Sequence, residues 1–147
     1  MRRVDRRQTR SKSRCESFAA RIPIRDPSFP MAVLHLKPLM VTYGSLHRHP
    51  EFEICYFPSD GGTFMIQDRE YTIRAGDVFI VNSNDIHQPV LRAARNDGAI
   101  VTYFSGRIFG PTEESGEWLN PFVLANRLGA NRVRSNRRLR NLIGELH

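Results

Sequence analysis

The stretch from residue 31 to residue 104 is a series of short apolar runs broken by turn residues, and this spacing constrains the fold more than any other feature of the chain. The breaks are rich in Gly, Asn and Asp, as in DGG at 60–62 and NSND at 82–85. Short strands at close, regular intervals with such turns are typical of an antiparallel sandwich or barrel. The sequence therefore predicts an all-β domain of about eight strands, in the runs MAVLHL, LMVTY, FEICYF, TFMIQ, YTIR, VFIV, IHQPVLR and AIVTYF.

The pattern changes after residue 110, where the apolar spacing lengthens to that of helices. The segment EWLNPFVLANRL can be helical on either side of Pro121. The segment RRLRNLIGELH carries apolar residues at i, i+3, i+4 and i+7, which form one face of a helix with arginines opposite. That face consists of Leu139, Leu142, Ile143 and Leu146. We therefore expect helices after the β domain, the last of them amphipathic.

The charge of the chain is concentrated at its two ends. The 147 residues suffice for one folded domain with its own core. Residues 1–25 carry a net charge of +7 and residues 127–147 one of +5, and because the whole chain carries +7, the middle carries −5. The high isoelectric point therefore belongs to the ends rather than to a binding face. We divide the chain into a basic arm at 1–30, which we expect to be disordered, a β domain at 31–110 and a helical segment at 111–147.

The basic arm leaves several interpretations open. Its composition favours a solvated tail, and direct contact with nucleic acid is the more specific alternative. Its arginine and serine content also resembles that of a transit peptide, although Asp5 and Glu16 do not suit one. Met31 is a further candidate for the start of the folded protein, because the strand pattern begins there.

Composition excludes several classes of protein. The longest apolar runs are only a few residues, too short for a transmembrane helix. Cys15 and Cys55 offer neither a disulfide framework nor a CxxC metal motif, so we expect a cytoplasmic protein with no membrane partner. The chain has no Gly-x-Ser-x-Gly, no phosphate-binding glycine loop and no plausible Cys–His pair, so we expect no catalytic residue.

The stretch HRHPEFEICYF places two histidines and a carboxylate ahead of an apolar strand. His47 and His49 are two residues apart, so on an extended strand both imidazoles project from one face, and Glu53 has the same parity. Pro50 leaves open whether that strand continues unbroken. His87 follows GDVFIVNSND, which as a hairpin can fold it back beside the first strand. Because imidazoles and carboxylates are usual ligands of zinc, iron and manganese, these residues are candidates for a metal site or for the polar lining of a pocket.

The two stretches together resemble the two sequence motifs of the cupin superfamily. GSLHRHPEFE contains His-x-His-x3-Glu, and GDVFIVNSNDIH contains Gly-x5-Asn-x-Asn-x2-His, where cupins have Gly-x5-Pro-x-Gly-x2-His. The likeness covers about residues 40–105. It implies a cupin-type antiparallel β-barrel, that is a double-stranded β-helix or jelly roll, followed by the C-terminal helices. By position it implies that the cupin metal ligands would be His47, His49, Glu53 and His87.

Within the cupins, the chain is most similar to the N-terminal sensor domain of AraC-type transcriptional regulators, through HRHPEFEICYF and DREYTIRAGDVFIVNSNDIHQPV. In that family the barrel binds a small effector, often a sugar, and helices after the barrel support dimerisation. The resemblance implies an effector-sensing and dimerisation domain, with no enzymatic activity and no cofactor, that forms a homodimer through its C-terminal helices. His47, His49, Glu53 and His87 would then line the effector pocket. We expect the DNA to be bound by a C-terminal helix-turn-helix domain that this chain lacks.

Two alternatives come from other classes of protein. One is a small metal-dependent cupin enzyme, a dioxygenase or isomerase, in which the same four residues hold one divalent transition metal. The other is direct binding of nucleic acid by the arginine-rich ends, with an affinity that falls steeply with salt.

Overall fold

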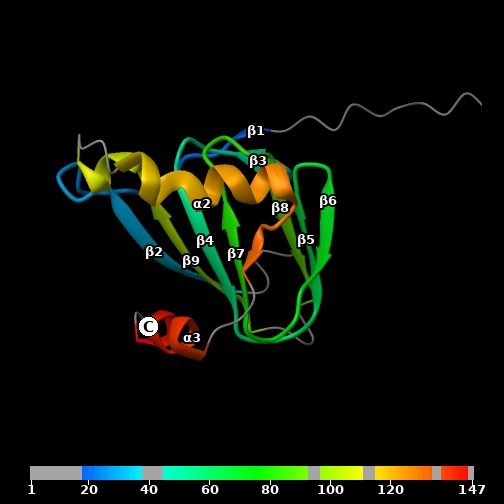
Figure 1. Cartoon of the computed structure of the whole chain (residues 1–147). Coiled ribbons are helices and arrows are strands. Elements are labelled where there is room, and N and C mark those ends of the chain that lie inside the picture. The colour runs from blue at the N-terminus through cyan, green and yellow to red at the C-terminus, as the bar shows by residue number, and fades with distance from the viewer. Residues whose placement is uncertain (1–17, 38–44, 93–96, 111–114, 134–136, 146–147) are drawn as a thin grey trace, which may run out of the picture.

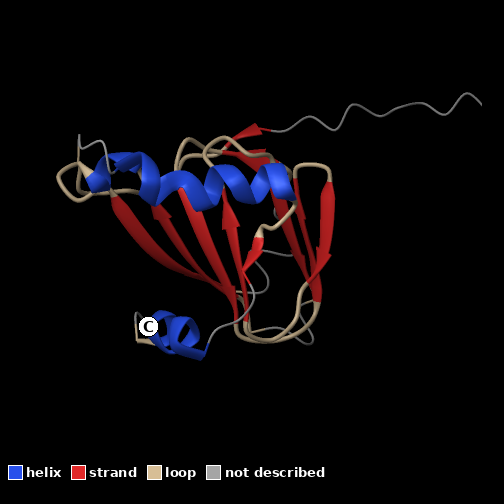
Figure 2. Cartoon of the chain, in the orientation of Figure 1, coloured by secondary structure: helices blue, strands red, loops and turns tan. Residues whose placement is uncertain are grey.

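The computed structural model describes residues 18–37, 45–92, 97–110, 115–133 and 137–145, whose strands form two facing sheets of five strands each (Figures 1 and 2). The first sheet has the order β1 (Phe18–Ala19), β3 (His47–Arg48), β8 (His87–Leu91), β5 (Gly62–Ile66) and β6 (Arg69–Thr72). The second has the order β10 (Arg132–Val133), β7 (Asp77–Val81), β4 (Phe52–Phe57), β9 (Ala99–Phe104) and β2 (Met31–Leu36). Neighbouring strands are antiparallel, except that β1 and β3 are parallel.

The antiparallel β architecture predicted from the turn spacing is confirmed, but the two sheets stay separate. Across the described residues, no strand of the first sheet pairs with a strand of the second. The structure is therefore a sandwich held by side-chain packing, where a closed barrel was expected. The predicted strand LMVTY lies outside the described residues.

The core lies between the sheets and is built from the inward-facing residues of both. β4 alternates between half-buried and buried positions, which turns Glu53, Cys55 and Phe57 inward. The rings of Phe57, Phe64 and Phe79 meet edge to face, with centroids 5.2–5.8 Å apart. Burying a side chain of this size contributes roughly 1.5–3 kcal/mol. These rings therefore join the two sheets at the centre of the sandwich.

Two of the short crossings between the sheets contain parts of the two sequence motifs. Residues 49–51 connect β3 to β4, and residues 82–86 connect β7 to β8. The crossings are bonded to each other: the Asn84 N–H donates to the carbonyl of His49 (2.8 Å), and the Ser83 hydroxyl donates to that of Pro50 (2.8 Å). The two sequence motifs are thus held side by side at the places where the chain changes sheet.

The second crossing corrects one prediction. GDVFIVNSND was expected to form a hairpin, but β7 pairs with β4 and β10 while β8 pairs with β3 and β5, so the two strands lie in opposite sheets. Asn84, which stands where the cupin motif has glycine, has a φ of 61°. Asparagine tolerates this left-handed conformation better than most residues, so it can replace the glycine in the turn.

Helix α2 (Ser115–Leu128) lies across one end of the second sheet, after a 3-10 turn, η2 (Gly106–Phe109) (Figure 1). The helix continues through Pro121. Its anchor is Phe122, whose ring centroid lies 5.3 Å from that of Phe52 and 5.4 Å from that of Phe104. Phe52 and Phe104 alternate with inward-facing residues of their strands, so α2 packs on the outer face of the sheet.

Helix α3 (Arg137–Gly144) confirms a helix after α2 and lies at the opposite end of the second sheet (Figure 1). Leu139 packs against Val78 and Ile100 on the outer face of that sheet. Leu142, on the same predicted apolar face, is 51% exposed. The side chain of Ile143 and the whole of Leu146 lie outside what the structure describes. A role of this helix in dimerisation stays a prediction.

Part of the predicted basic arm lies along the sandwich. β1 pairs with β3, and the Ala20 N–H donates to the carbonyl of Arg48 (2.9 Å). Residues 1–17 are outside the described residues. The division into segments 1–30, 31–110 and 111–147 stays a prediction. In the described part of the chain, no helix is long and apolar enough to cross a membrane.

Candidate ligand-binding or metal site

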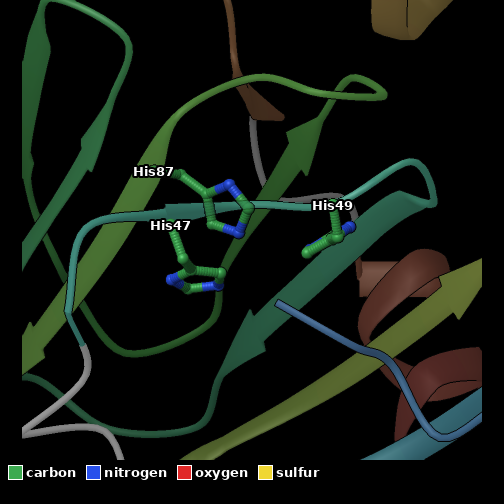
Figure 3. Close-up of side chains that lie close together, drawn as sticks. All are labelled: His47, His49 and His87. Atoms are coloured by element: carbon green, nitrogen blue, oxygen red, sulfur yellow. The ribbon is translucent and has the colours of Figure 1, made fainter. Parts of the chain in front are cut away.

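The structure brings the four predicted site residues together inside one end of the sandwich. His47 on β3 is the direct pairing partner of His87 on β8. His49 follows β3, and its ring centroid lies 5.0 Å from that of His87 and 5.9 Å from that of His47. Figure 3 shows the three imidazole rings close together. Glu53 joins them from β4 in the facing sheet, and we call these four residues the histidine cluster.

Glu53 reaches the cluster by a different route from the one its sequence parity suggested. The prediction left open whether one strand continues through Pro50. In the structure the chain leaves the first sheet after His49 and enters the second sheet at Phe52. The inward alternation of β4 then points Glu53 back towards the histidines across the sandwich. The cluster is therefore built from both sheets.

Three members of the cluster are almost completely buried. His49, Glu53 and His87 are 2%, 3% and 1% exposed, and His47 is half-buried. The Oε2 atom of Glu53 lies 3.1 Å from His49 Nε2 and 3.2 Å from His87 Nε2. Although close to Glu53, the Nε2 atom of His87 has no hydrogen bond of good geometry. A carboxylate and two imidazoles thus meet at one buried point.

The three histidines share a hydrogen-bond pattern that fixes which ring nitrogen faces the cluster. Nδ1 of His47 bonds the carbonyl of Ser45 (2.8 Å), and Nδ1 of His49 that of Glu51 (3.2 Å). Nδ1 of His87 bonds the carbonyl of Asp85 (2.8 Å). Because a carbonyl can only accept, Nδ1 of His47 and Nδ1 of His87 carry the hydrogen and donate it, so each of these two rings, when neutral, has its lone pair on Nε2. His49 faces an acceptor on both sides, because its Nε2 also bonds Glu53 Oε2 (3.1 Å), and a neutral ring can donate to only one of them.

The cluster is consequently rich in acceptors. The Nε2 lone pair of His87 and the Glu53 carboxylate face each other at 3.2 Å, and two acceptors cannot bond without a donor or a cation between them. A proton on one histidine, a metal ion or a hydrogen-bond donor from a ligand would each satisfy the site. The arrangement is thus chemically incomplete without one of these three.

The shifted pKa values indicate which group of the cluster binds a proton. Burial raises the pKa of Glu53, but the charge of His87 and the bond from His49 outweigh it, so this pKa lies well below its usual range. Burial lowers the pKa of His87, but the charge of Glu53 outweighs it and the net shift is upwards. Burial lowers the pKa of His47, and the charge of His87 adds to that effect. His87 is therefore a protonated partner of Glu53 at mildly acidic pH.

The donor set also fits a divalent transition metal. One ligating nitrogen atom from each histidine lies within 4.8 Å of those of the other two. Two nitrogens bound to one ion at about 2.1 Å are at most about 4.2 Å apart, so the rings would move closer together around an ion. Metal-binding histidines usually donate their other ring N–H to a carbonyl or carboxylate, and the Nδ1 atom of each of the three histidines lies beside a backbone carbonyl here. His47, His49, Glu53 and His87 would be the ligands.

Three further residues at the site were not predicted. The Tyr103 ring lies 5.2 Å from that of His49, and its hydroxyl has no hydrogen-bond partner among the described residues. Glu51 is half-buried with Oε2 3.5 Å from His49 Nδ1. Asp85 is 5% exposed and precedes His87 by two residues. The alternation of AIVTYF could have indicated an inward Tyr103, but nothing in the sequence distinguishes Asp85 from an ordinary turn aspartate.

The class of structure is thus an antiparallel β-sandwich with a buried cluster of three histidines and one carboxylate. Comparison with protein-family models gives the family: the model of the AraC-like ligand binding domain matches residues 32–147. The chain belongs to this family, and the resemblance inferred from the two motifs is confirmed. A search of curated proteins found no match.

The similar solved structures are distant from this chain in sequence. An oxalate decarboxylase of Bacillus subtilis, in a structure whose subject is its Mn(II) centres, is 22% identical with a TM-score of 0.41 over 69% of this chain and 29% of its own. The plu4264 protein of Photorhabdus luminescens is 14% identical with a TM-score of 0.32, over 64% of this chain and 62% of its own. This chain thus spans less than a third of the length of the oxalate decarboxylase.

Proposed function

We propose that this domain binds a small effector molecule inside the sandwich and passes its presence to the DNA-binding part of a transcriptional regulator. Membership of the AraC-like ligand binding domain family supports this role. The observation that carries the proposal is the buried meeting of His87 Nε2 with the Glu53 carboxylate, which form no hydrogen bond with each other, because it provides a place and a chemical need for a ligand.

The cluster would select a ligand that donates hydrogen bonds. The hydroxyl groups of a sugar or another polyol, or an ammonium group, would donate hydrogen bonds to the Nε2 atoms and to the Glu53 carboxylate. Tyr103 adds an aromatic surface and an unpaired hydroxyl next to His49. His47 is the least buried member of the cluster, so we place the entry on its side.

The wider role of the domain follows from the family. We propose a homodimer through the C-terminal helices, with DNA bound by a separate domain. α2 exposes apolar side chains that could serve such an interface, namely Trp118, Leu124 and Leu128. Effector binding would act as a population shift between arrangements of the paired regulators.

The proposal is tested by measuring the melting temperature of the protein in the presence of each member of a panel of sugars and polyols. A ligand at 100 times its Kd stabilises the folded state by about 2.7 kcal/mol, which raises the melting temperature of a chain this size by roughly 5–10 °C. Glu53→Gln should abolish that rise. His35→Ala is the matched control, because His35 lies exposed on the outer face of β2. A ligand that stabilises Glu53→Gln as much as the native chain would contradict binding at the cluster.

The second candidate is a metal-dependent cupin enzyme, favoured by the common orientation of the three Nε2 atoms. Elemental analysis of protein purified without chelators, after growth with manganese, iron and zinc, separates the candidates. Stoichiometric metal that disappears in His49→Ala would contradict an effector site without metal. Protein free of metal under these conditions would contradict the enzyme.

A further inference from the structure

Asp85 is a buried residue that contacts both the histidine cluster and helix α2. Its backbone carbonyl accepts the Nδ1 hydrogen of His87 at 2.8 Å. Its side-chain Oδ1 accepts from Asn126 Nδ2 on α2 at 3.0 Å and from Gln67 Nε2 at 2.6 Å. One residue thus bonds the cluster through its main chain and the helix through its side chain.

Asn126, the residue of α2 that bonds Asp85, is itself held by a hydrogen bond to its backbone carbonyl. The Asn126 carbonyl accepts from Arg69 Nη1 at 2.8 Å, while Phe122 and Ala125 bury the neighbouring turn of α2. The other carboxylate oxygen of Asp85, Oδ2, is buried and has no hydrogen-bond partner. The side-chain contact between Asp85 and α2 is therefore made through Oδ1.

We infer that Asp85 is a positioning residue that makes the docking of α2 depend on the orientation of the His87 ring. A ligand bound at Nε2 of His87 holds the ring, and through Nδ1 the ring holds the Asp85 peptide and its carboxylate. The regulatory meaning of this connection rests on the proposed function, since it assumes that a ligand occupies the cluster. The hydrogen bonds that form the connection do not themselves require a ligand.

His47 provides the matched control within the cluster. Like His87, it donates Nδ1–H to a backbone carbonyl at 2.8 Å, but that carbonyl belongs to Ser45 and not to Asp85. If the connection runs through Asp85, removing the two rings must affect α2 differently. If α2 responds only to a general destabilisation of the histidine cluster, the removal of either ring must have the same effect on α2.

Hydrogen exchange of the full ligand-free chain tests this difference. In His87→Ala, the amides of α2 around Asn126 should exchange roughly threefold to tenfold faster, as expected for the loss of about one net hydrogen bond. His47→Ala should leave them within about twofold, and the β9 amides should be unchanged in both variants. Equal acceleration of α2 in the two variants, or none in His87→Ala, would overturn the inference.

The reverse experiment serves if His87→Ala does not fold. Asn126→Ala changes a half-buried helix residue, and the nitrogen resonances of the three imidazoles can be followed by NMR. The His87 Nδ1 resonance should shift and that of His47 should not. Arg127→Ala, on the exposed side of the same turn, should shift neither. A shift of both histidines in Asn126→Ala, or of neither, would contradict the role of Asp85.

These outcomes are independent of effector identity. If the sugar panel fails and the exchange difference between His87→Ala and His47→Ala is observed, the connection stands and the proposed ligand is wrong. If a ligand binds at the cluster and the two variants behave alike, the proposed function stands and the connection through Asp85 is wrong.

Discussion

Polar residues reach the interior of the sandwich at two places, and the two differ in how donors and acceptors are matched. At the first, which we call the Asn131 corner, Tyr71, Asn131 and Arg132 join the strands β6 and β7. The Tyr71 hydroxyl lies 3.2 Å from Asn131 Oδ1, and Asn131 Nδ2 donates to the Ile80 carbonyl at 3.0 Å. The Ile80 N–H donates back to the Asn131 carbonyl at 2.9 Å.

Arg132 completes the corner. Its guanidinium lies against the rings of Tyr71 and Phe79, 5.8 and 5.3 Å from their centroids. It also lies 3.4 Å from the Asp77 carboxylate and bonds the Thr72 carbonyl. In the Asn131 corner the side-chain amide and the tyrosine hydroxyl have complementary partners, although Arg132 Nε is buried without a hydrogen bond. In the histidine cluster the Nε2 atom of His87 faces the Glu53 carboxylate without a hydrogen bond. We therefore expect the corner to contribute to stability and the cluster to be the site of a ligand.

The largest effect is expected from Asn131→Ala. Asn131 is 0% exposed, and its loss leaves the Ile80 carbonyl and the Tyr71 hydroxyl without their buried partner. Each buried group left unpaired costs about 1–3 kcal/mol, so the free energy of unfolding should fall by about 2–5 kcal/mol. Urea unfolding followed by circular dichroism measures this. A fall below about 1 kcal/mol would show that the corner is not a structural network.

A pH effect of intermediate size is expected from the cluster in chelator-treated protein. Since the pKa of Glu53 is lowered in the folded state, its contribution is present above the unfolded value of 4.5 and is lost as pH falls through the folded value. Since the pKa of His87 is raised, its contribution is present below 6.5 and is lost as pH rises through the folded value. The stability of the pair is therefore greatest between these two unfolded values.

Urea unfolding at pH 5.5 and pH 8.5 checks the sign. The native chain should be less stable at pH 8.5, by roughly 1.4 kcal/mol for each unit by which the His87 pKa is raised. Glu53→Gln removes the charge that raises this pKa, so its stability should vary less between the two conditions. An equal pH dependence in both proteins would show that Glu53 and His87 do not act as a pair.

A smaller effect is expected from Tyr71→Phe at the Asn131 corner. The change removes the hydroxyl that lies 3.3 Å from the Gly129 carbonyl and 3.2 Å from Asn131 Oδ1. One hydrogen bond contributes about 0.5–1.5 kcal/mol net, so unfolding should become easier by about 1 kcal/mol. Binding of a ligand at the histidine cluster, measured by calorimetry, should be unchanged. A loss of binding would mean that the two sites are not independent.

The smallest effect on stability is expected from Tyr103→Phe, the matched change at the cluster. Within the described residues this hydroxyl has no hydrogen-bond partner, so its removal should change the free energy of unfolding by less than about 0.5 kcal/mol. Any effector found by the sugar panel should nevertheless bind more weakly. If Tyr103→Phe destabilises the chain as much as Tyr71→Phe, the distinction between the two sites fails.

The candidate site could be located from the sequence to a considerable extent. Two-residue periodicity and the His-x-His spacing singled out His47 and His49, and the second motif singled out His87. The register that pairs His47 with His87 confirms that the motifs meet. The Asn131 corner was missed, because its members come from β6 and from the turn after α2, which no local pattern relates.

The amino-acid sequence by itself determined the strand alternation, the turns and the identity of the clustered side chains, because these depend on neighbours along the chain. Only the tertiary structure decided that the sheets stay separate, that Glu53 faces the histidines across the sandwich, and that each Nδ1 is used by a carbonyl. The physical reason is that hydrogen-bond matching at a buried point depends on groups that are distant in sequence. Whether a histidine pair is part of a satisfied network or of an open site is therefore decided by packing and not by spacing.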